Sequence, residues 1–280
     1  MRLSLANGLA LGAMALWVSL AALGVALQHI PPFLLTGMAL LIGSLVSLPL
    51  AGFDWRVWRV PLRTLALGVY GLFGYHFLLF MALRDAPPVQ ANLVNYLWPV
   101  GMVVLGPLLG SGTPLSLKHV VAAGMGFAGA ALAITGGQSL AWVPRWGYLR
   151  ALGAAAVWSS YSLWTQKVPA FPTAALGLFG FVSGLLALLC HAALEAPIAL
   201  SAQDAGYLVA MGLGPLGAAF YLWDAALKRG DARQIGLLSF ITPLGSTCLL
   251  LWVRGETPDL WVLLSAVLIV GAAWVGTRPT

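Results

Sequence analysis

Long apolar runs separated by short polar connections occupy most of the chain. Each run has roughly 17 to 25 residues, the length at which a helix crosses ~30 Å of hydrocarbon, and hydrocarbon admits only helices or closed barrels. The pattern predicts ten spans with the approximate bounds Leu5–Gln28, Phe33–Ala51, Leu62–Leu83, Val89–Leu109, Leu115–Ile134, Tyr148–Gln166, Thr173–Leu194, Ala205–Leu227, Gln234–Arg254 and Leu260–Gly276. The chain is therefore predicted to be an all-α integral membrane protein.

The fourth predicted span carries a polar face. At 100° per residue, its polar and aromatic side chains lie within about 160° of one another, and aliphatic side chains take the opposite face. The polar face comprises Asn92, Asn95, Tyr96, Trp98, Pro99 and Met102. We expect one side of this helix to face lipid and the other to face something polar.

Composition agrees with a membrane location. The chain is 60% hydrophobic and 8% charged, with a mean hydropathy of +0.92, whereas a soluble domain has about 25% charged residues. The formal charge of +6 does not indicate nucleic-acid binding, because the basic residues stand at span ends and follow no single face.

The basic residues instead predict the topology, because Lys and Arg favour the cytoplasmic side. If the N-terminus is cytoplasmic, the inside residues are Arg2, Arg56, Arg59, Arg63, Lys118, Lys167, Lys228, Arg229, Arg233 and Arg278. The outside residues are then Arg84, Arg145, Arg150 and Arg254. Ten against four predicts that both termini are cytoplasmic.

The two halves of the sequence repeat each other. The run ALGAMALWVS ending at Ser19 returns as ALGAAAVWSS ending at Ser160, an offset of 141 residues. At an offset of 144, the segment 68–114 aligns without gaps to 212–258 with 12 identities in 47 positions. The identities include Gln90 with Gln234, Pro99 with Pro243 and Gly101 with Gly245.

This repeat predicts two units of five spans, residues 1–144 and residues 145–280. Because five is odd, the second unit enters the membrane from the opposite side, so the two repeats are inverted. Inverted repeats place a substrate site near the midplane and allow one half to rock against the other. The architecture is typical of a transporter.

Short motifs resemble a known family over the whole chain, the EamA-type branch of the drug/metabolite transporter superfamily. They are the helix openings Ala15–Trp17 and Ala156–Trp158, the mid-span prolines Pro99 and Pro243, and the segment Gly255–Pro258 before the tenth span. Aromatic residues of the third, fourth and sixth spans resemble those of bacterial aromatic amino acid exporters of the YddG type. The segment Gly110–Pro114 departs from the pattern because it lacks a counterpart of Glu256. The halves are therefore expected to move unequally.

Depth in the membrane selects candidate ligand residues. Trp17, Trp98, Trp158, Tyr161 and Pro243 all lie about 8 to 12 residues into their spans, near the bilayer centre. An aromatic cage there could stack a side chain and attract an ammonium group through cation–π contact, worth about 0.5 to 2 kcal/mol. The alternative is packing against neighbouring helices. Tryptophans near span ends, by contrast, are expected to be interface anchors: Trp55, Trp58, Trp142, Trp146 and Trp261.

Prolines and polar groups extend the predicted site. Pro99 and Pro243 should free the carbonyls of Asn95 and Ser239 and act as hinges. His76 lies deep in the third span, where a polar residue suggests function, and it could donate to a substrate carboxylate. The predicted substrate-binding residues are Trp17, His76, Asn92, Asn95, Tyr96, Trp98, Trp158, Tyr161 and Ser239.

No Asp or Glu lies near the centre of a predicted span, so we expect transport without obligatory proton exchange. Asp224 comes closest, and an i,i+4 pair with Lys228 at the cytoplasmic end explains it. No Cys/His spacing indicates a metal, and neither a cofactor nor a catalytic residue is expected.

The sequence therefore predicts a monomeric carrier of the bacterial inner membrane that exports aromatic and other neutral amino acids by alternating access. Its only expected partners are the small-molecule substrate and the lipid bilayer. A multidrug or other small-metabolite exporter is the main alternative, because one fold serves many substrates. An intramembrane enzyme that uses Ser159, Ser160 and His76 is a third reading, which lacks an orienting carboxylate.

Overall fold

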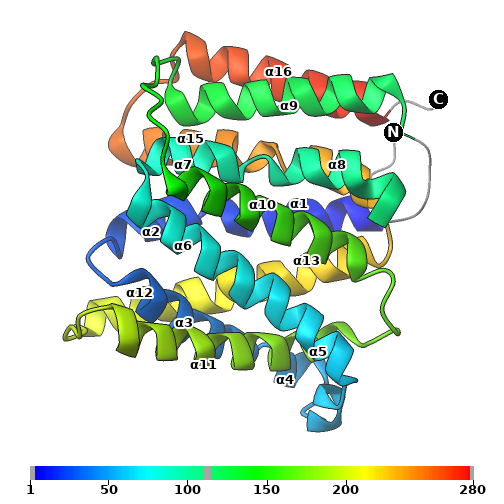
Figure 1. The fold of residues 1–280 in the computed structure, drawn as a ribbon, viewed down its shortest axis with the longest axis vertical. Coiled ribbons are helices and arrows are strands. Elements are labelled where there is room, and N and C mark those ends of the chain that lie inside the picture. Colours follow the sequence, from blue (N-terminus) through cyan, green and yellow to red (C-terminus); the bar gives the residue numbers. More distant parts are fainter. Residues whose placement is uncertain (1–3, 110–114, 278–280) are drawn as a thin grey trace.

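A computed structural model describes residues 4–109 and 115–277, which form a bundle of ten helical segments (Figure 1). The segments are called spans 1 to 10 in chain order. Three sequence features lie outside the described residues: Arg2, Arg278 and the segment Gly110–Pro114. The all-helical architecture and the ten spans predicted from the sequence are confirmed within the described part.

The first five spans make up the first half of the chain. Their elements are α1 (Leu5–Val18) and α2 (Leu20–Ala26) in span 1, α3 (Pro32–Ser44) and α4 (Ser47–Leu50) in span 2, α5 (Leu62–Val69), η2 (Tyr70–Gly74) and α6 (Tyr75–Asp85) in span 3, α7 (Pro88–Asn95) and α8 (Trp98–Leu109) in span 4, and α9 (Leu117–Thr135) in span 5. A short 3-10 turn, η1 (Trp55–Trp58), lies between spans 2 and 3.

Spans 6 to 10 make up the second half. Their elements are α10 (Trp146–Trp164) in span 6, η3 (Thr173–Ala175) and α11 (Leu176–Leu194) in span 7, α12 (Ala202–Leu213), η4 (Gly214–Ala218) and α13 (Ala219–Leu227) in span 8, α14 (Ala232–Leu238) and α15 (Ile241–Arg254) in span 9, and α16 (Leu260–Thr277) in span 10. Eight of the ten spans are long and apolar enough to cross a membrane, and span 10 is a shorter apolar helix. Span 6 packs between α6 and α8 inside the bundle.

The two halves deviate from regular helix at equivalent positions. Both η2 and η4 are five-residue π-helical segments, and they are related by the same offset of 144 that aligns the sequences. Spans 4 and 9 are both broken just before their prolines, at residues 96–97 and 239–240. Proline lacks an amide hydrogen and clashes with the preceding turn, so each break falls where Pro99 and Pro243 predict it. π-Helical segments recur at functional sites in helices.

The helices form layers that are stacked from the top to the bottom of Figure 1, across the direction in which the helices run. Spans 5 and 10 pair at one end, where α9 packs along α16, and spans 2 and 7 pair at the other, where α3 packs along α11 (Figure 1). Spans 1, 3, 4, 6, 8 and 9 lie between these pairs. Each outer pair joins equivalent spans of the two halves, so the layering follows the repeat.

Close backbone contact holds span 2 against span 8. A Cβ added to Gly43 would lie 2.7 to 2.9 Å from the carbonyl oxygens of Leu216 and Gly212 and from the Cα of Gly217, all of them backbone atoms. The Tyr221 hydroxyl also donates to the Gly43 carbonyl at 3.2 Å. Gly43 is therefore required for the approach of α3 to η4.

Along the direction in which the helices run, the start of α1 and the end of α16 lie at the same end of the bundle, on the right in Figure 1. The connections after spans 1, 3, 5, 7 and 9 lie at the other end. Trp55, Trp142, Trp146 and Trp261 are exposed near span ends, as expected for interface anchors. Trp58 is half-buried and donates to the Ser47 hydroxyl.

Candidate functional site

A cavity of about 1090 Å³ extends into the bundle between spans 1, 3, 4, 5 and 9. Its mouth is lined by residues at span ends, among them Gln28, Gln138 and Arg254. Its inner part is lined by mid-span residues, including Trp17, Trp98, Trp158 and Phe220. Gln28 and Gln138 follow the ends of spans 1 and 5, and Arg254 is the last residue of span 9, so the cavity opens on the side opposite the start of α1.

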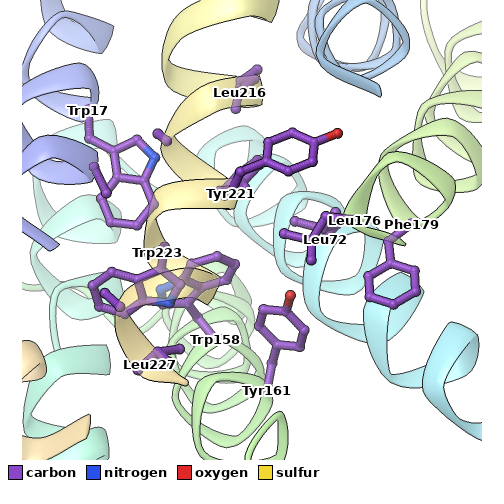
Figure 2. Packing of buried hydrophobic residues seen from close by; sticks show 14 of the residues in the cluster. Trp17, Leu72, Trp158, Tyr161, Leu176, Phe179, Leu216, Tyr221, Trp223 and Leu227 are labelled. Carbon is purple, nitrogen blue, oxygen red and sulfur yellow. The ribbon is translucent and has the colours of Figure 1, made fainter. Parts of the chain in front are cut away.

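Four tryptophans form the inner end of the cavity and the packing behind it. Trp17 lies 6.0 Å from Trp158 and 5.2 Å from Trp223 between ring centroids, and Trp98 lies 6.4 Å from Trp158 and 5.6 Å from Trp223. Trp223 is 1% exposed and does not line the cavity, so it supports the three indoles that do. Figure 2 shows Trp223 beside Trp17 and Trp158. We call these four residues the tryptophan floor. It separates the cavity from the opposite end of the bundle.

Hydrogen bonds fix the orientation of the floor. The Trp17 indole donates to the Pro215 carbonyl at 3.1 Å, within the π-helical segment η4. The Trp223 indole donates to the Ser162 hydroxyl at 3.2 Å. Ser159 donates to the Trp98 carbonyl at 2.8 Å and to the Ala155 carbonyl of its own helix at 2.7 Å, so the polar face of span 6 bonds both to a neighbour and to itself.

Polar side chains of spans 3 and 4 form one wall of the cavity. The Asn95 amide donates to the Tyr75 hydroxyl at 3.1 Å, and Tyr75 in turn packs on Trp158 at 5.3 Å between centroids. Asn92 also lines the cavity, and its side-chain amide has no hydrogen-bond partner among the described residues. The wall therefore offers one amide that is held in place and one that is available to a ligand.

His76 is oriented by its own helix. Its Nδ1 lies 2.6 Å from the Leu72 carbonyl, and a carbonyl only accepts, so this nitrogen carries the hydrogen. In neutral His76 the remaining nitrogen, Nε2, is then an acceptor. This arrangement suits a substrate ammonium group, whereas the carboxylate contact expected from the sequence requires a protonated ring.

The structure brings most of the predicted site residues together. The cavity is lined by Trp17, His76, Asn92, Asn95, Tyr96, Trp98, Trp158 and Pro243. Tyr161, Ser239 and Pro99 do not line it. Tyr161 lies one helical turn beyond Trp158, packs on it at 5.4 Å and covers Gly71, while Ser239 is fully buried and donates to the Gly236 carbonyl at 2.6 Å. Substrate binding by any of these residues stays a prediction.

Three aromatic residues of this region were not predicted from the sequence. Tyr75 is adjacent to His76 in the middle of span 3, and Phe220 aligns with His76 at the offset of 144. Both could have been found from depth and from the repeat. Trp223 aligns with Leu79 and sits nearer the end of its span, so only its contacts reveal its place in the floor.

The residues of the enzyme reading lie apart. Ser159 donates to the carbonyls of Trp98 and Ala155, Ser160 bonds to Tyr70 at 2.8 Å, and His76 bonds to its own helix. Within the described residues, no three His, Cys, Asp or Glu side chains are grouped for a metal. Among the described residues, His76 therefore pairs with neither Ser159 nor Ser160.

A buried carboxylate, paired with a lysine at the surface, joins spans 7 and 8 on the side of the bundle opposite the mouth. The Lys228 ammonium bonds to the Asp224 carboxylate at 2.6 Å and to the Phe171 carbonyl at 2.9 Å, and Thr173 donates to the same carboxylate at 2.6 Å. The pair expected from the i,i+4 spacing is confirmed. Burial lowers the pKa of Lys228, although the Asp224 carboxylate acts in the opposite direction. The cluster ties the start of span 7 to the end of span 8.

We predict that Lys228→Met lowers protein stability by about 3 kcal/mol, because it leaves the buried Asp224 carboxylate without its counter-ion. The measurement is the thermal midpoint in detergent. Asp224→Asn in the same chain should recover much of the loss. Lys167→Met is the matched control, since this lysine is exposed and its ammonium donates to the Leu108 carbonyl at 3.4 Å without an ion pair among the described residues. Equal shifts in Lys228→Met and Lys167→Met would contradict a structural role for the pair.

Comparison with known proteins assigns this architecture. The sequence pattern of the EamA-like transporter family matches the chain twice, over residues 4–135 and 145–277. The chain belongs to the EamA-like transporter family. It is therefore a multi-pass membrane carrier built from two EamA repeats, and it is not an enzyme. The division at residues 144 and 145 is a prediction that these matches leave open.

Two individual relatives narrow the comparison. The chain is 38% identical over 273 residues to the aromatic amino acid exporter YddG of Ancylobacter novellus, covering 95% of this chain and 94% of the relative. A solved crystal structure superposes with a TM-score of 0.92 at 36% identity, covering 97% of this chain and 96% of the other. The fold is thus shared with an experimentally determined structure over nearly its full length.

Proposed function

We propose that this EamA-family transporter exports aromatic and other neutral amino acids from the cytoplasm across a bacterial inner membrane. The observation that carries the proposal is the cavity, whose inner end is aromatic and whose wall from spans 3 and 4 is polar. The similarity of the chain to an aromatic amino acid exporter supports the same substrate class.

The substrate would bind above the tryptophan floor. Its side chain stacks on Trp98 and Trp158, and its ammonium group meets Asn92 and the Nε2 of His76. Tyr96, Asn95 and Trp17 complete the wall. Tyr161 and Ser239 lie behind the wall and position it, because Tyr161 packs on Trp158 and Ser239 holds the break in span 9.

Alternating access would use the symmetric irregularities of the helices. With cytoplasmic termini, the cavity faces outward and the tryptophan floor closes the cytoplasmic side. The breaks before Pro99 and Pro243 let each end of spans 4 and 9 move separately, and η2 and η4 do the same for spans 3 and 8. One chain contains both halves of the pathway, which favours a functional monomer.

Transport would not require proton exchange. The residues that line the cavity include no Asp or Glu, so the described wall has no carboxylate that alternates between a proton and a substrate. Rapid counterflow without a pH gradient is the expected behaviour. His76→Gln tests whether the histidine contributes, since it removes the titratable ring.

The deciding experiment is counterflow of labelled tryptophan in proteoliposomes, with unlabelled competitors on the outside. Tryptophan, phenylalanine, tyrosine and smaller neutral amino acids should compete, whereas sugars and bulky organic cations should not. Stronger competition by organic cations than by tryptophan would favour the multidrug alternative. Absence of tryptophan counterflow would overturn the proposal.

Membrane orientation has its own prediction. A cysteine at the exposed position Glu256 should react with an impermeant thiol reagent added outside intact cells, and a cysteine at the exposed position Arg229 should react only after lysis. Both variants are made in a chain in which Cys190 and Cys248 are serines. The reverse labelling pattern would place the termini outside and turn the cavity toward the cytoplasm.

A further inference from the structure

Among the described residues, one charged side chain lines the cavity, and the proposed binding of a zwitterion above the tryptophan floor does not use it. Arg254 ends α15 at the cavity mouth and is exposed. The other described residues that line this cavity are neutral or, in the case of His76, held by a backbone carbonyl. Arg254 is therefore considered separately from the tryptophan floor.

The acidic groups of this end of the bundle are engaged elsewhere. Asp85 pairs with Arg150, and Asp204 pairs with His29 at 3.1 Å. Glu195 accepts from the backbone amide of Phe33 at 3.0 Å and from that of Leu34 at 3.2 Å, and it also pairs with His191 at 2.9 Å.

The acids that follow Arg254 in the chain do not neutralise it either. Asp259 accepts from the backbone amide of Val262, and Glu256 is exposed without an ion pair. Within the described residues, the Arg254 side chain has no ion pair or hydrogen bond. Its positive charge is therefore available to the cavity.

Arg254 is too far from the floor to share a substrate with it. It lies 12 residues beyond Thr242, which lines the inner cavity, and this is about 18 Å along a helix. An amino acid stacked on Trp98 and Trp158 does not span that distance. Any ligand of Arg254 occupies an outer position.

We infer that Arg254 is a specificity-determining residue that forms an outer subsite for carboxylates and makes the mouth unfavourable for cationic solutes. A cleft with low-dielectric walls concentrates the field of a charge, and the Arg fork suits a carboxylate. The neutral amide groups of Gln28 and Gln138 share the mouth and complete a polar vestibule. The inference rests on the proposed function for the identity of the substrate, but the field at the mouth exists whatever is carried.

The first arm of the test measures that field without any substrate. A cysteine at Gln138, with Cys190 and Cys248 replaced by serine, is labelled at low ionic strength with anionic or cationic methanethiosulfonate reagents of similar size. The ratio of the two rates, anionic over cationic, should fall roughly fourfold in Arg254→Gln, from the potential of a unit charge at ~10 Å in water. Arg254→Lys should retain the ratio, and about 1 M NaCl should remove the difference.

The second arm measures selectivity with three ligands that share an indole ring. N-Acetyltryptophan is anionic, tryptophan is zwitterionic and tryptophan amide is cationic. Arg254→Gln should weaken inhibition of labelled tryptophan counterflow by the anion and strengthen inhibition by the cation, each about threefold, a size typical of an exposed charge pair. Arg145→Gln is the control, because this outer arginine does not line the cavity.

The outcomes separate the two proposals. An unchanged labelling ratio in Arg254→Gln would overturn the outer subsite, even if tryptophan is transported normally. A changed ratio in a protein that does not transport tryptophan would retain the charged mouth and reject the proposed function. A changed ratio with no effect on the three indole ligands would reject Arg254 as a specificity determinant.

Discussion

Replacement of Trp158 by alanine is expected to lower tryptophan transport roughly tenfold relative to threonine transport, because it removes a stacking face and a cation–π partner. Trp158 is the centre of the floor: its ring contacts Trp17, Trp98 and Trp223. Threonine has no ring to stack, so its transport depends less on this surface. The measurement is the ratio of the two counterflow rates, normalised to folded protein.

Stability must be measured with it, because Trp158 is only 4% exposed and its truncation leaves a void that can cost about 3 to 5 kcal/mol. Trp158→Phe keeps an aromatic face and should retain most of the ratio. Trp146→Ala is the control, since this 75% exposed residue lies at a span end. An unchanged ratio in Trp158→Ala beside a lowered melting temperature would make the floor a packing feature alone.

Replacement of Gly43 by alanine is expected to prevent normal folding or to lower the thermal midpoint severely. The new methyl would stand 2.7 to 2.9 Å from three backbone atoms of span 8, and backbone atoms cannot rotate aside as a side chain does. Overpacking typically costs about 1 to 3 kcal/mol, and a rigid backbone contact lies at the upper end. The yield of monodisperse protein and its melting temperature report the effect.

Gly206→Ala is the matched control for this substitution. A Cβ at Gly206 meets nothing within 4 Å, and alanine is favoured over glycine inside a helix by about 1 kcal/mol. The control should therefore keep or raise the melting temperature. Equal behaviour of Gly43→Ala and Gly206→Ala would show that spans 2 and 8 can separate at little cost.

The contact of span 2 with span 8 is connected to the tryptophan floor. The span that Gly43 contacts contains η4, and the Pro215 carbonyl of η4 holds the Trp17 indole. The orientation of the floor is therefore linked to the packing of span 2 on span 8. Movement of span 8 about η4 would release the indole, which gives a physical route from helix motion to an open floor.

Much of the architecture was accessible from the sequence. Hydropathy located all ten helical segments, eight of which are long and apolar enough to cross a membrane. The positions of Pro99 and Pro243 located the breaks because proline lacks an amide hydrogen. The repeat located equivalent positions, and depth brought Trp17, Trp98 and Trp158 to one level. Those signals are local or periodic, so they can be recognised in the sequence without knowledge of tertiary contacts.

The remaining features depend on which helices meet. Span 6 is buried on several sides, so hydropathy cannot say which of its faces meets the cavity, and Tyr161 lies one turn below the wall that it was predicted to join. Trp223 enters the floor because span 8 packs on span 1. In the sequence, Arg254 served only to predict the membrane topology, and the structure places it at the mouth of the cavity. The sequence by itself determined the spans, their repeat and the depth of their aromatic residues. Only the tertiary structure decided the side on which the cavity opens, because that depends on contacts between helices far apart in the chain.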